Sequence, residues 1–427
     1  MLRWIPEPET RPCPLSELIV VSAQVGDEFS DTGRDVETHI LPLMRALGIR
    51  YVQVARHGHL EADGITVLSD TRQPSTVYLA GDYRLSDELR RNGTVPQFAG
   101  VHRCALKFKA FVIEKWLADN VRGEAAHAIG YNAQETGRVE TSEYAFAQRA
   151  THTARVAFGF NADETSRVER ANEYDGLRAA PSQVPDGEAI AFGFNADETL
   201  RIGRNTEYNT LTRTAFYPLM VWNWTRQDCI NYIERVIGVI WRKSCCVYCP
   251  FAHNKQNSAD LLARHAEHPE QVADAMMLER ASLSLNPRGT LYKNQSLISI
   301  TAAAGNTVAI AAYQSALVAT PWALYRVRRI YHAARNNPAR KGQADRAVEL
   351  LALIEPTSAR PILDRLAACL NSTIHEQHGI AYVYQERTGT TYPAREDFYV
   401  VAPAVVQTKA RYGLDWFNGK WNQQDLF

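Results

Sequence analysis

A strand, a helix and a second strand follow one another near the start of the chain, and this alternation constrains the fold more than any other feature. Leu18–Ala23 is a short, apolar and β-branched run, typical of a buried strand. Val36–Leu47 has apolar residues at helical spacing and ends at Gly48. Ile49–Ala55 alternates as a second strand. This β-α-β unit predicts an α/β fold with an open, mostly parallel sheet and helices on both faces.

Composition excludes several classes of protein. Among 427 residues, Lys+Arg and Asp+Glu are 47 each, so no overall charge favours nucleic acid or membrane, although a local basic groove stays open. No run reaches the roughly 18 apolar residues of a membrane span, and the N-terminus does not resemble a signal peptide. Seven clustered cysteines argue against a secreted disulfide framework. We therefore expect a cytoplasmic protein that binds no membrane.

The loop after the first strand is the first candidate binding segment. Gln24–Gly33 is polar, and a loop in this position lies at the carboxyl edge of the sheet, where open α/β folds bind ligands. Asp27, Glu28 and Asp31 could hold a metal–phosphate group, and the backbone at Thr32 could bind an anion. The alternative is an acidic helix N-terminus that complements the helix dipole. The residues favour neither interpretation.

Cysteines supply the most specific chemistry in the chain. Cys245, Cys246 and Cys249 lie within five positions, and the last two have the C-x2-C spacing that aims two thiolates at one metal or cluster. Cys104 is flanked by basic residues, opens a predicted helix over Cys104–Asn120, and is the best candidate for a further ligand. A metal or iron–sulfur site is predicted; the alternative is a packed or redox-active dithiol without metal.

An internal repeat interrupts the predicted sheet at about residues 126–210. Its copies are Ala128–Arg138, Ala157–Arg167 and Ala191–Arg201, each a short strand followed by an acidic turn and an arginine. We expect only one copy to occupy a place in the sheet. The Glu and Arg of a copy could meet a phosphate at the carboxyl end of its strand, or they could form surface ion pairs.

The domain division predicted is an α/β domain over 1–255, a helical region over 256–372 and a small extension over 373–427. The helices expected are Ala259–His268, Glu270–Ser284, Ile298–Val318, Pro321–Ala334, Ala344–Ile354 and Ser358–Leu370. The extension has two strand-like runs, Ala381–Tyr384 and Phe398–Val401, and an aromatic tail that either docks or is disordered.

Taken together, these segments resemble the phosphoadenosine-phosphosulfate (PAPS) reductase family of the adenine-nucleotide α-hydrolase (PP-loop ATP pyrophosphatase) superfamily, over about Leu18–Phe251. Asp31–Thr38 is similar to the family's D-T-G-x-x-F-P-E-T segment, and the repeat copies resemble its G-x-R/E segment. Tyr217-Pro218-Leu219 with Trp224–Asp228 is similar to Y-P-L-x-x-W-T-x-x-D, with two extra residues between the halves. The C-x2-C pair stands where cluster-bearing members carry their second cysteine pair.

The chain departs from the family in two places. No PP-loop of the S-G-G-x-D-S kind is present, and Met1–Pro6 resembles the end of the helix that should follow it, which indicates a truncated start or a lost pyrophosphate site. The C-terminal redox cysteine of sulfonucleotide reductases is also missing. The resemblance therefore favours the sulfur-transfer branch, which includes DNA phosphorothioation and tRNA thiolation proteins.

The resemblance implies an iron–sulfur enzyme that uses an adenine nucleotide, ATP or PAPS with Mg²⁺, for sulfur transfer or reduction. It places a [4Fe–4S] cluster, or alternatively zinc, on Cys104, Cys245, Cys246 and Cys249, with Cys104, Cys246 and Cys249 taking part in the reaction. The nucleotide would meet Asp27, Glu28, Asp31, Thr32, Glu198, Arg201 and Arg204. One alternative is an inactive, metal-stapled subunit of a nucleic-acid modification or defence complex, bound to nucleic acid or a partner protein. Another is a sulfonucleotide reductase.

Overall fold

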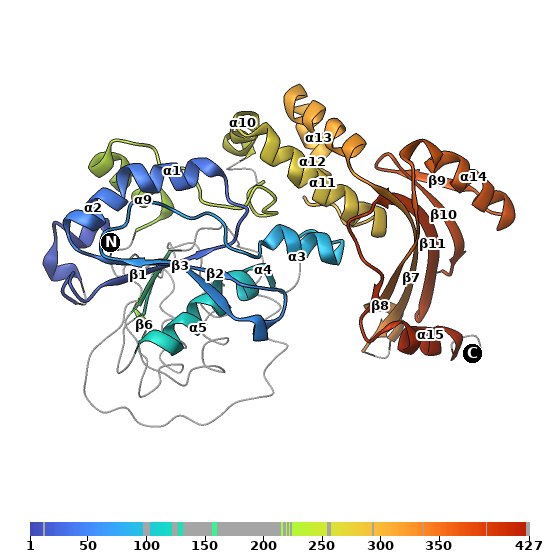
Figure 1. The fold of residues 1–427 in the computed structure, drawn as a ribbon, viewed down its shortest axis with the longest axis horizontal. Helices are drawn as coiled ribbons and strands as arrows, with labels where there is room; N and C mark the ends of the chain where they lie inside the picture. Colours follow the sequence, from blue (N-terminus) through green and yellow to red (C-terminus); the bar gives the residue numbers. More distant parts are fainter. Residues whose placement is uncertain are drawn as a thin grey trace. The chain divides into compact units, whose positions relative to one another are not determined.

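The chain divides into two compact units, and each is described by itself. The first is Met1–Leu85 with Val101–Val247, and the second is Ser86–Gly100 with Tyr248–Phe427. The computed structural model describes residues 1–11, 13–96, 103–121, 127–130, 156–159, 215–216, 219, 222, 224–253, 258–292, 294–335, 337–389 and 391–423. Figure 1 shows the elements of both units.

A mixed sheet forms the centre of the first unit (Figure 1). Its strands, in the order β3-β2-β1-β5-β4-β6, are β1 (Ile19–Gln24), β2 (Arg50–Arg56), β3 (Ile65–Thr71), β4 (His127–Gly130), β5 (Val156–Gly159) and β6 (Ala215–Phe216). β1 runs parallel to β2 and β5, β4 runs parallel to β5 and β6, and β3 is antiparallel to β2. The predicted β-α-β unit is confirmed, and with it a mixed α/β class.

Helices lie on both faces of β1 and β2. α1 (Ser30–His39) packs through Val36, and α2 (Leu41–Ala46) packs through Leu41 and Met44, against a core that includes Tyr51 and Trp4. On the opposite face, α4 (Arg103–Ala105), the π-helical turn η4 (Leu106–Ala110) and α5 (Phe111–Asn120) follow one another. Successive residues of β2 point to opposite faces of the sheet. Tyr51 belongs to the core beneath α2, and the guanidinium of the preceding Arg50 lies 5.3 Å from the ring centroid of Trp116 in α5.

Three 3-10 turns and one further helix also belong to the first unit. The 3-10 turns are η1 (Leu2–Trp4), η2 (Pro8–Thr10) and η3 (Glu61–Asp63), and α9 covers Arg226–Ile237. The sequence predicts a helix over Arg226–Val236 with Thr225 as its N-cap and Gly238 at its end, and both ends are confirmed. Thr225 caps its N-terminus together with Asp228 in a capping box, and Gly238 ends it with a left-handed φ of 81°.

Two expectations for the first unit are wrong. The helix predicted over Val36–Leu47 begins earlier, at Ser30, and breaks at Ile40, because Pro42 lies in the first turn of α2 and lacks an N–H to continue α1. The first two repeat copies both contribute strands, β4 and β5, and the repeat glycines Gly130 and Gly159 lie opposite each other. The two strand sequences are similar, and they pair with each other in register, with Ala128 opposite Ala157. The third copy lies outside the described residues.

The second unit is built on a six-stranded antiparallel sheet in the order β12-β8-β7-β11-β10-β9. Its strands are β7 (Trp322–Ala334), β8 (Asn337–Ile354), β9 (Ile374–Gln377), β10 (Ile380–Arg387), β11 (Ala394–Pro403) and β12 (Lys409–Ala410). Its helices are α3 (Leu85–Asn92), which begins at the unit boundary, α10 (Ser258–Glu267), α11 (Pro269–Leu285), α12 (Leu297–Ala303), α13 (Thr307–Ala319), α14 (Ala359–Cys369) and α15 (Leu414–Gln423), with the 3-10 turn η7 (Pro356–Ser358).

The helices predicted over Pro321–Ala334 and Ala344–Ile354 are wrong: both segments are strands, so the region 256–372 is helical only as far as Ala319 and again over α14. The physical reason is pairing. β7 pairs with β8 along one edge and with β11 along the other, and side chains on both of its faces are buried. In β8, the pairing with β7 overrides the helix preference of Ala, Glu and Leu. The expected strand pair near the C-terminus is confirmed as β10 and β11, with Tyr382 opposite Val400.

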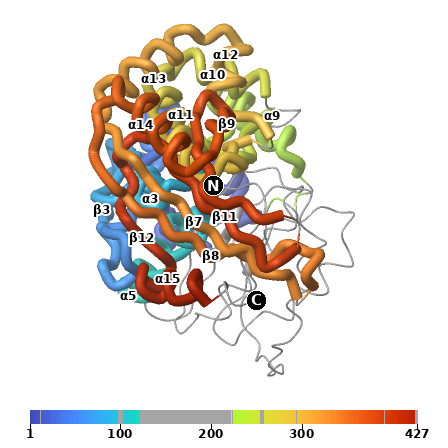
Figure 2. The backbone as a smooth tube through the Cα atoms, turned by 90° about the vertical axis from the view of Figure 1, so that its right-hand side faces the viewer, coloured from blue at the N-terminus to red at the C-terminus, as the bar shows by residue number. Residues whose placement is uncertain are grey.

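Different elements cover the two faces of this sheet. One face packs Tyr325, Val327 and Phe398 against Leu283 and Leu285 of α11. The other is covered by α14 at one end of the strands and by α15 at the other, as Figure 2 shows. The aromatic tail therefore docks, at least as far as Gln423. Among the described residues, every helix is too short or too polar to cross a lipid bilayer.

Candidate functional site

The loop after β1 is held in a sharp turn at the carboxyl end of the strand. Gly26 has a φ of 95°, and its N–H donates to the Leu79 carbonyl at 2.9 Å. A Cβ on Gly26 would lie 2.6 Å from Cγ of Arg84, so both its conformation and its surroundings require glycine. This turn directs Asp27 and Glu28 to the edge where the parallel strands β1 and β2 end.

The cysteine segment docks on this loop. Cys246 and Glu28 form an antiparallel β-bridge, and the Val247 N–H donates to the Asp27 carbonyl at 3.0 Å. The two segments are more than 200 residues apart in the chain, so the contact is purely tertiary. The structure thus joins the two strongest motifs of the sequence at one edge of the sheet.

Side chains reinforce the backbone contact. Ser244 Oγ donates to Glu28 Oε2 at 2.9 Å, and Lys109 Nζ lies 3.7 Å from Glu28 Oε1. Arg242 Nη1 lies 3.5 Å from Asp31 Oδ2, and the Asp31 side chain is only 2% exposed. Three cationic or hydroxyl side chains therefore engage the acidic loop, and two of them come from the cysteine segment.

The charge of Glu28 also reaches the strand beneath it. Burial, with a smaller contribution from the nearby Glu28 carboxylate, raises the pKa of Tyr51 to about 12, although hydrogen bonds from Ser22 and Gln24 oppose the rise. Tyr51 therefore stays a neutral phenol at any physiological pH. It can contribute a hydrogen bond to the site but no negative charge.

The helical run that contains Cys104 is anchored at the same edge of the sheet. Arg56, the last residue of β2, is 1% exposed and donates to the carbonyls of Lys107, Gly58 and His59. Its guanidinium also lies 5.6 Å from the ring of Phe108. This anchor ties the helical run that Cys104 opens to the carboxyl end of β2, and Lys109, in the same run, reaches Glu28.

The thiols differ in burial and in how closely they approach one another. Cys245 is buried, and Cys104 and Cys246 are half-buried. Among the described residues, these three sulfur atoms of the first unit do not all lie within 4.8 Å of one another. Thiolates on one zinc ion lie ~3.8 Å apart, given Zn–S bonds of about 2.3 Å. A zinc ion would therefore draw them closer, whereas a [4Fe–4S] cluster is larger and holds its thiolates farther apart. The donor set, sulfur only, suits either group.

The remaining predicted residues fall in three places. Cys249 is half-buried in the second unit, where its carbonyl accepts from the Ala252 N–H at 3.1 Å. Asp31 and Thr32 lie in the first turn of α1, and the Thr32 N–H donates to the Phe29 carbonyl, so it serves the helix rather than an anion. Glu198, Arg201 and Arg204 lie outside the described residues.

Sequence reasoning missed the partners of the acidic loop. Ser244 and Lys109 were visible only as a polar residue before the cysteines and as one of several basic residues after Cys104. No periodicity or spacing links them to Glu28. The sequence signal for each is a nearby cysteine, because Ser244 precedes Cys245 and Lys109 follows Cys104. That signal becomes informative only once both segments are known to meet at Glu28.

No protein-family model, no curated protein and no solved structure matches this chain. The geometry at the carboxyl edge of β1 and β2 therefore carries the functional argument by itself.

Proposed function

We propose that this chain is an iron–sulfur protein that resembles the PAPS reductase family and uses an adenine nucleotide in sulfur transfer. One observation carries the proposal: the cysteine segment is bonded to the acidic loop after β1, through Cys246 opposite Glu28 and Val247 on Asp27. A thiolate site and a ligand-binding loop at one sheet edge are what a reaction between a nucleotide-activated group and sulfur requires.

The proposal includes the finer fold, an open and mostly parallel sheet of the adenine-nucleotide α-hydrolase kind. The parallel pairings of β1 with β2 and β5, and of β4 with β5 and β6, support it. Helices on both faces of β1 and β2 support it as well. In such sheets the ligand lies outside the carboxyl ends of the strands, which is where Glu28 and Cys246 meet.

The residues take distinct parts in this proposal. Cys104, Cys245, Cys246 and Cys249 would hold the cluster, which when bound supplies a site for sulfur or electron exchange. Lys109 and Arg242 now neutralise Glu28 and Asp31. A nucleotide phosphate would compete for the same two cations, because a dianionic phosphate is a stronger partner than a carboxylate. The acids would then be released toward Mg²⁺.

A second candidate function is favoured by the same ion pairs. Because Glu28 and Asp31 are already paired, the loop could serve only to fix the cysteine segment, and the chain would be a metal-stapled binding subunit of a nucleic-acid modification or defence complex. A sulfonucleotide reductase remains a third candidate, and it requires thioredoxin-dependent release of sulfite. All three fit the reducing cytoplasm, which remains the predicted location.

Metal content tests the cluster. The whole chain, purified without oxygen, is expected to be brown, with about four irons per chain and matching sulfide. Cys246→Ala should lose most of the iron, whereas the matched control Cys369→Ala, at an exposed position on α14, should keep it. A colourless protein with one zinc per chain would overturn the cluster and leave a structural staple. A protein without metal would overturn the metal site and indicate that the cysteines have packing or redox roles.

Nucleotide turnover separates the enzyme from the binding subunit. In the presence of Mg²⁺, the cluster-loaded protein is expected to release pyrophosphate from ATP or, with reduced thioredoxin as the two-electron donor, sulfite and adenosine 3′,5′-bisphosphate from PAPS. Lys109→Ala should weaken nucleotide binding, while Lys115→Ala, which removes an exposed lysine from the same helical run, should not. An iron-loaded protein that neither binds nor turns over either nucleotide would favour the binding subunit.

A further inference from the structure

The second unit contains a pocket that the proposed function does not use. Its volume is about 460 Å³, within the range of about 300–1,000 Å³ usual for ligand sites. His332 and Asp345 of β7 and β8 line one side, and Arg411, Tyr412, Trp416 and Lys420, from the C-terminal segment, line the other. All of these residues belong to one compact unit and lie far in sequence from the cysteine site.

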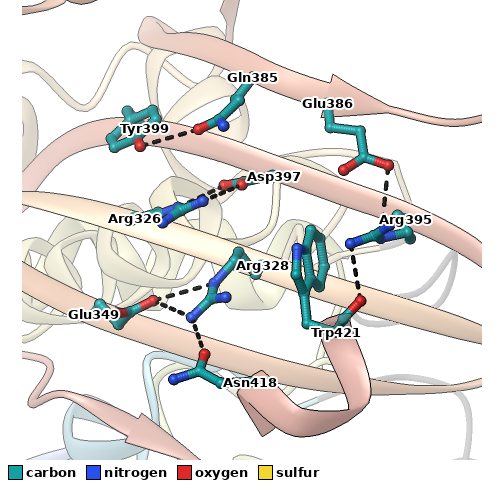
Figure 3. A network of polar contacts seen from close by, with 10 residues as sticks. All are labelled: Arg326, Arg328, Glu349, Gln385, Glu386, Arg395, Asp397, Tyr399, Asn418 and Trp421. Atoms are coloured by element: carbon teal, nitrogen blue, oxygen red, sulfur yellow. Dashed lines mark hydrogen bonds and ion pairs between the residues drawn. The ribbon is translucent and has the colours of Figure 1, made fainter. Parts of the chain in front are cut away.

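The helix that forms one wall is firmly seated on the sheet. Phe417 and Trp421 of α15 pack against Ile330 and Ala347. Figure 3 shows two polar anchors beside them: Arg328 Nη2 donates to Asn418 Oδ1 at 2.6 Å, and Arg395 Nη2 donates to the Trp421 carbonyl at 3.1 Å. The helix therefore cannot slide or rotate freely, so its remaining side chains have defined positions.

Trp416 and Lys420 lie one helical turn apart on α15, and both line the pocket. Trp416 is 36% exposed, and Tyr412, which precedes the helix, is 58% exposed. Their rings meet edge to face with centroids 4.6 Å apart. Two large aromatic rings thus present apolar surface to solvent at one site, where a planar ligand could cover them.

Cations surround this aromatic pair. The Arg411 guanidinium lies 5.1 Å from the Tyr412 ring centroid, and Lys420 Nζ lies 4.4 Å from that of Trp416. Asp345 is the carboxylate among the lining residues, and it is already engaged by His332 Nε2 at 2.7 Å and by Lys420 Nζ at 3.6 Å. The pocket therefore carries an excess of positive charge and favours an anionic ligand.

We propose that this pocket binds one nucleotide, with its base against Tyr412 and Trp416 and its phosphate at Arg411 and Lys420. Aromatic rings flanked by Arg and Lys are how proteins hold single nucleotides and single-stranded nucleic acid. Gln343, which also lines the pocket, offers an amide that can donate to and accept from a base edge. The nucleotide can be free or one unit of a single strand, and both share the chemistry described. The proposal does not depend on the cysteine site.

Binding by the whole chain tests the proposal in two arms. In the first, a fluorescein-labelled ten-residue oligothymidylate or oligoadenylate is titrated and its anisotropy is followed. In the second, AMP competes with the bound strand. Trp416→Ala is expected to weaken strand binding at least about fivefold, because one base–aromatic stack is worth ~1–3 kcal/mol. Trp416→Phe keeps a ring and should retain most of the affinity, and an unchanged far-UV circular dichroism spectrum of Trp416→Ala would show that its loss of affinity is not misfolding.

Charge variants complete the design. Lys420→Ala should lower the slope of log affinity against log salt by about 0.7, the value for one phosphate contact on a single strand. Arg360→Ala removes an exposed arginine from α14 in the same unit and should leave both affinity and slope unchanged. Competition by AMP would identify a free nucleotide as a ligand, and strand binding without it would identify single-stranded nucleic acid. Absence of both, or equal binding by wild type and Trp416→Ala, would overturn the proposal.

Discussion

At the scale of single residues, buried ionisable side chains fix local parts of the structure. Glu279 of α11 is 1% exposed, and its two carboxylate oxygens accept from the backbone N–H groups of Leu291 and Leu297 at 2.7 and 2.6 Å. It therefore fixes the turn between α11 and α12. In the sequence it is one glutamate of an ordinary helix, and nothing in the spacing distinguishes it from an exposed residue.

Burial raises the pKa of Glu279 to about 7 from 4.5, although the backbone N–H donors oppose the rise. Because the folded-state pKa is above the unfolded one, the native state holds the proton more tightly. This contribution to the free energy of unfolding is full below pH 4.5 and is lost as the pH rises to about 7. Urea unfolding of wild type and Glu279→Gln across this range should show the wild type losing stability relative to the variant as the pH rises. A constant difference would contradict the expected titration.

At the scale of elements, local signals located helices well where the chain carries its own start and stop residues. α9 lies between Thr225 and Gly238 as the sequence predicts, since both caps act within one turn. β7 and β8 were mistaken for helices, because Ala, Leu and Glu favour a helix and the strand partners are remote in sequence. The repeat strands β4 and β5 were mispredicted for a similar reason, because a repeated sequence does not reveal whether each copy will pair with a neighbouring strand.

The cap of α9 provides the test at this scale. Thr225→Ala removes the side chain that accepts from the Asp228 N–H, and we expect a loss of about 1 kcal/mol in the free energy of unfolding, typical for such caps. Gln227→Ala, an exposed position in the same turn, is the matched control and should change stability by less than about 0.5 kcal/mol. Equal losses in the two variants, measured by urea unfolding, would show that the cap contributes little.

At the scale of the whole molecule, two compact units with separate cores carry two different candidate sites. The first core surrounds Leu41 and Tyr51, and the second surrounds Tyr325 and Phe398. The sequence predicted an α/β part, and the mixed sheet of the first unit with its helices confirms it. The sequence did not predict that the helical region and the C-terminal extension join one antiparallel sheet.

Separate cores predict separate responses to mutation. Phe398 is fully buried in the second unit, and Phe398→Ala should cost about 3–5 kcal/mol through lost burial and a cavity. Calorimetry should then show one unfolding transition shifted to lower temperature and a second transition unchanged. Leu353→Ala, at a 70% exposed position of β8, is the control and should shift neither. A parallel shift of both transitions would indicate that the units unfold as one.

By itself the sequence determined the β-α-β unit, the capped helix α9, the helices α10 and α11 and the two motifs of the candidate site, whereas the single helix expected over Ile298–Val318 is the two helices α12 and α13. These depend on side-chain period, caps and spacing, which act over a few residues. Only the tertiary structure decided that Cys246 lies opposite Glu28, that β7 and β8 are strands, and that Trp416 and Lys420 face His332 and Asp345 across a pocket. Whether such segments pair depends on which apolar and polar surfaces the rest of the fold has already buried. A local sequence pattern does not contain that information.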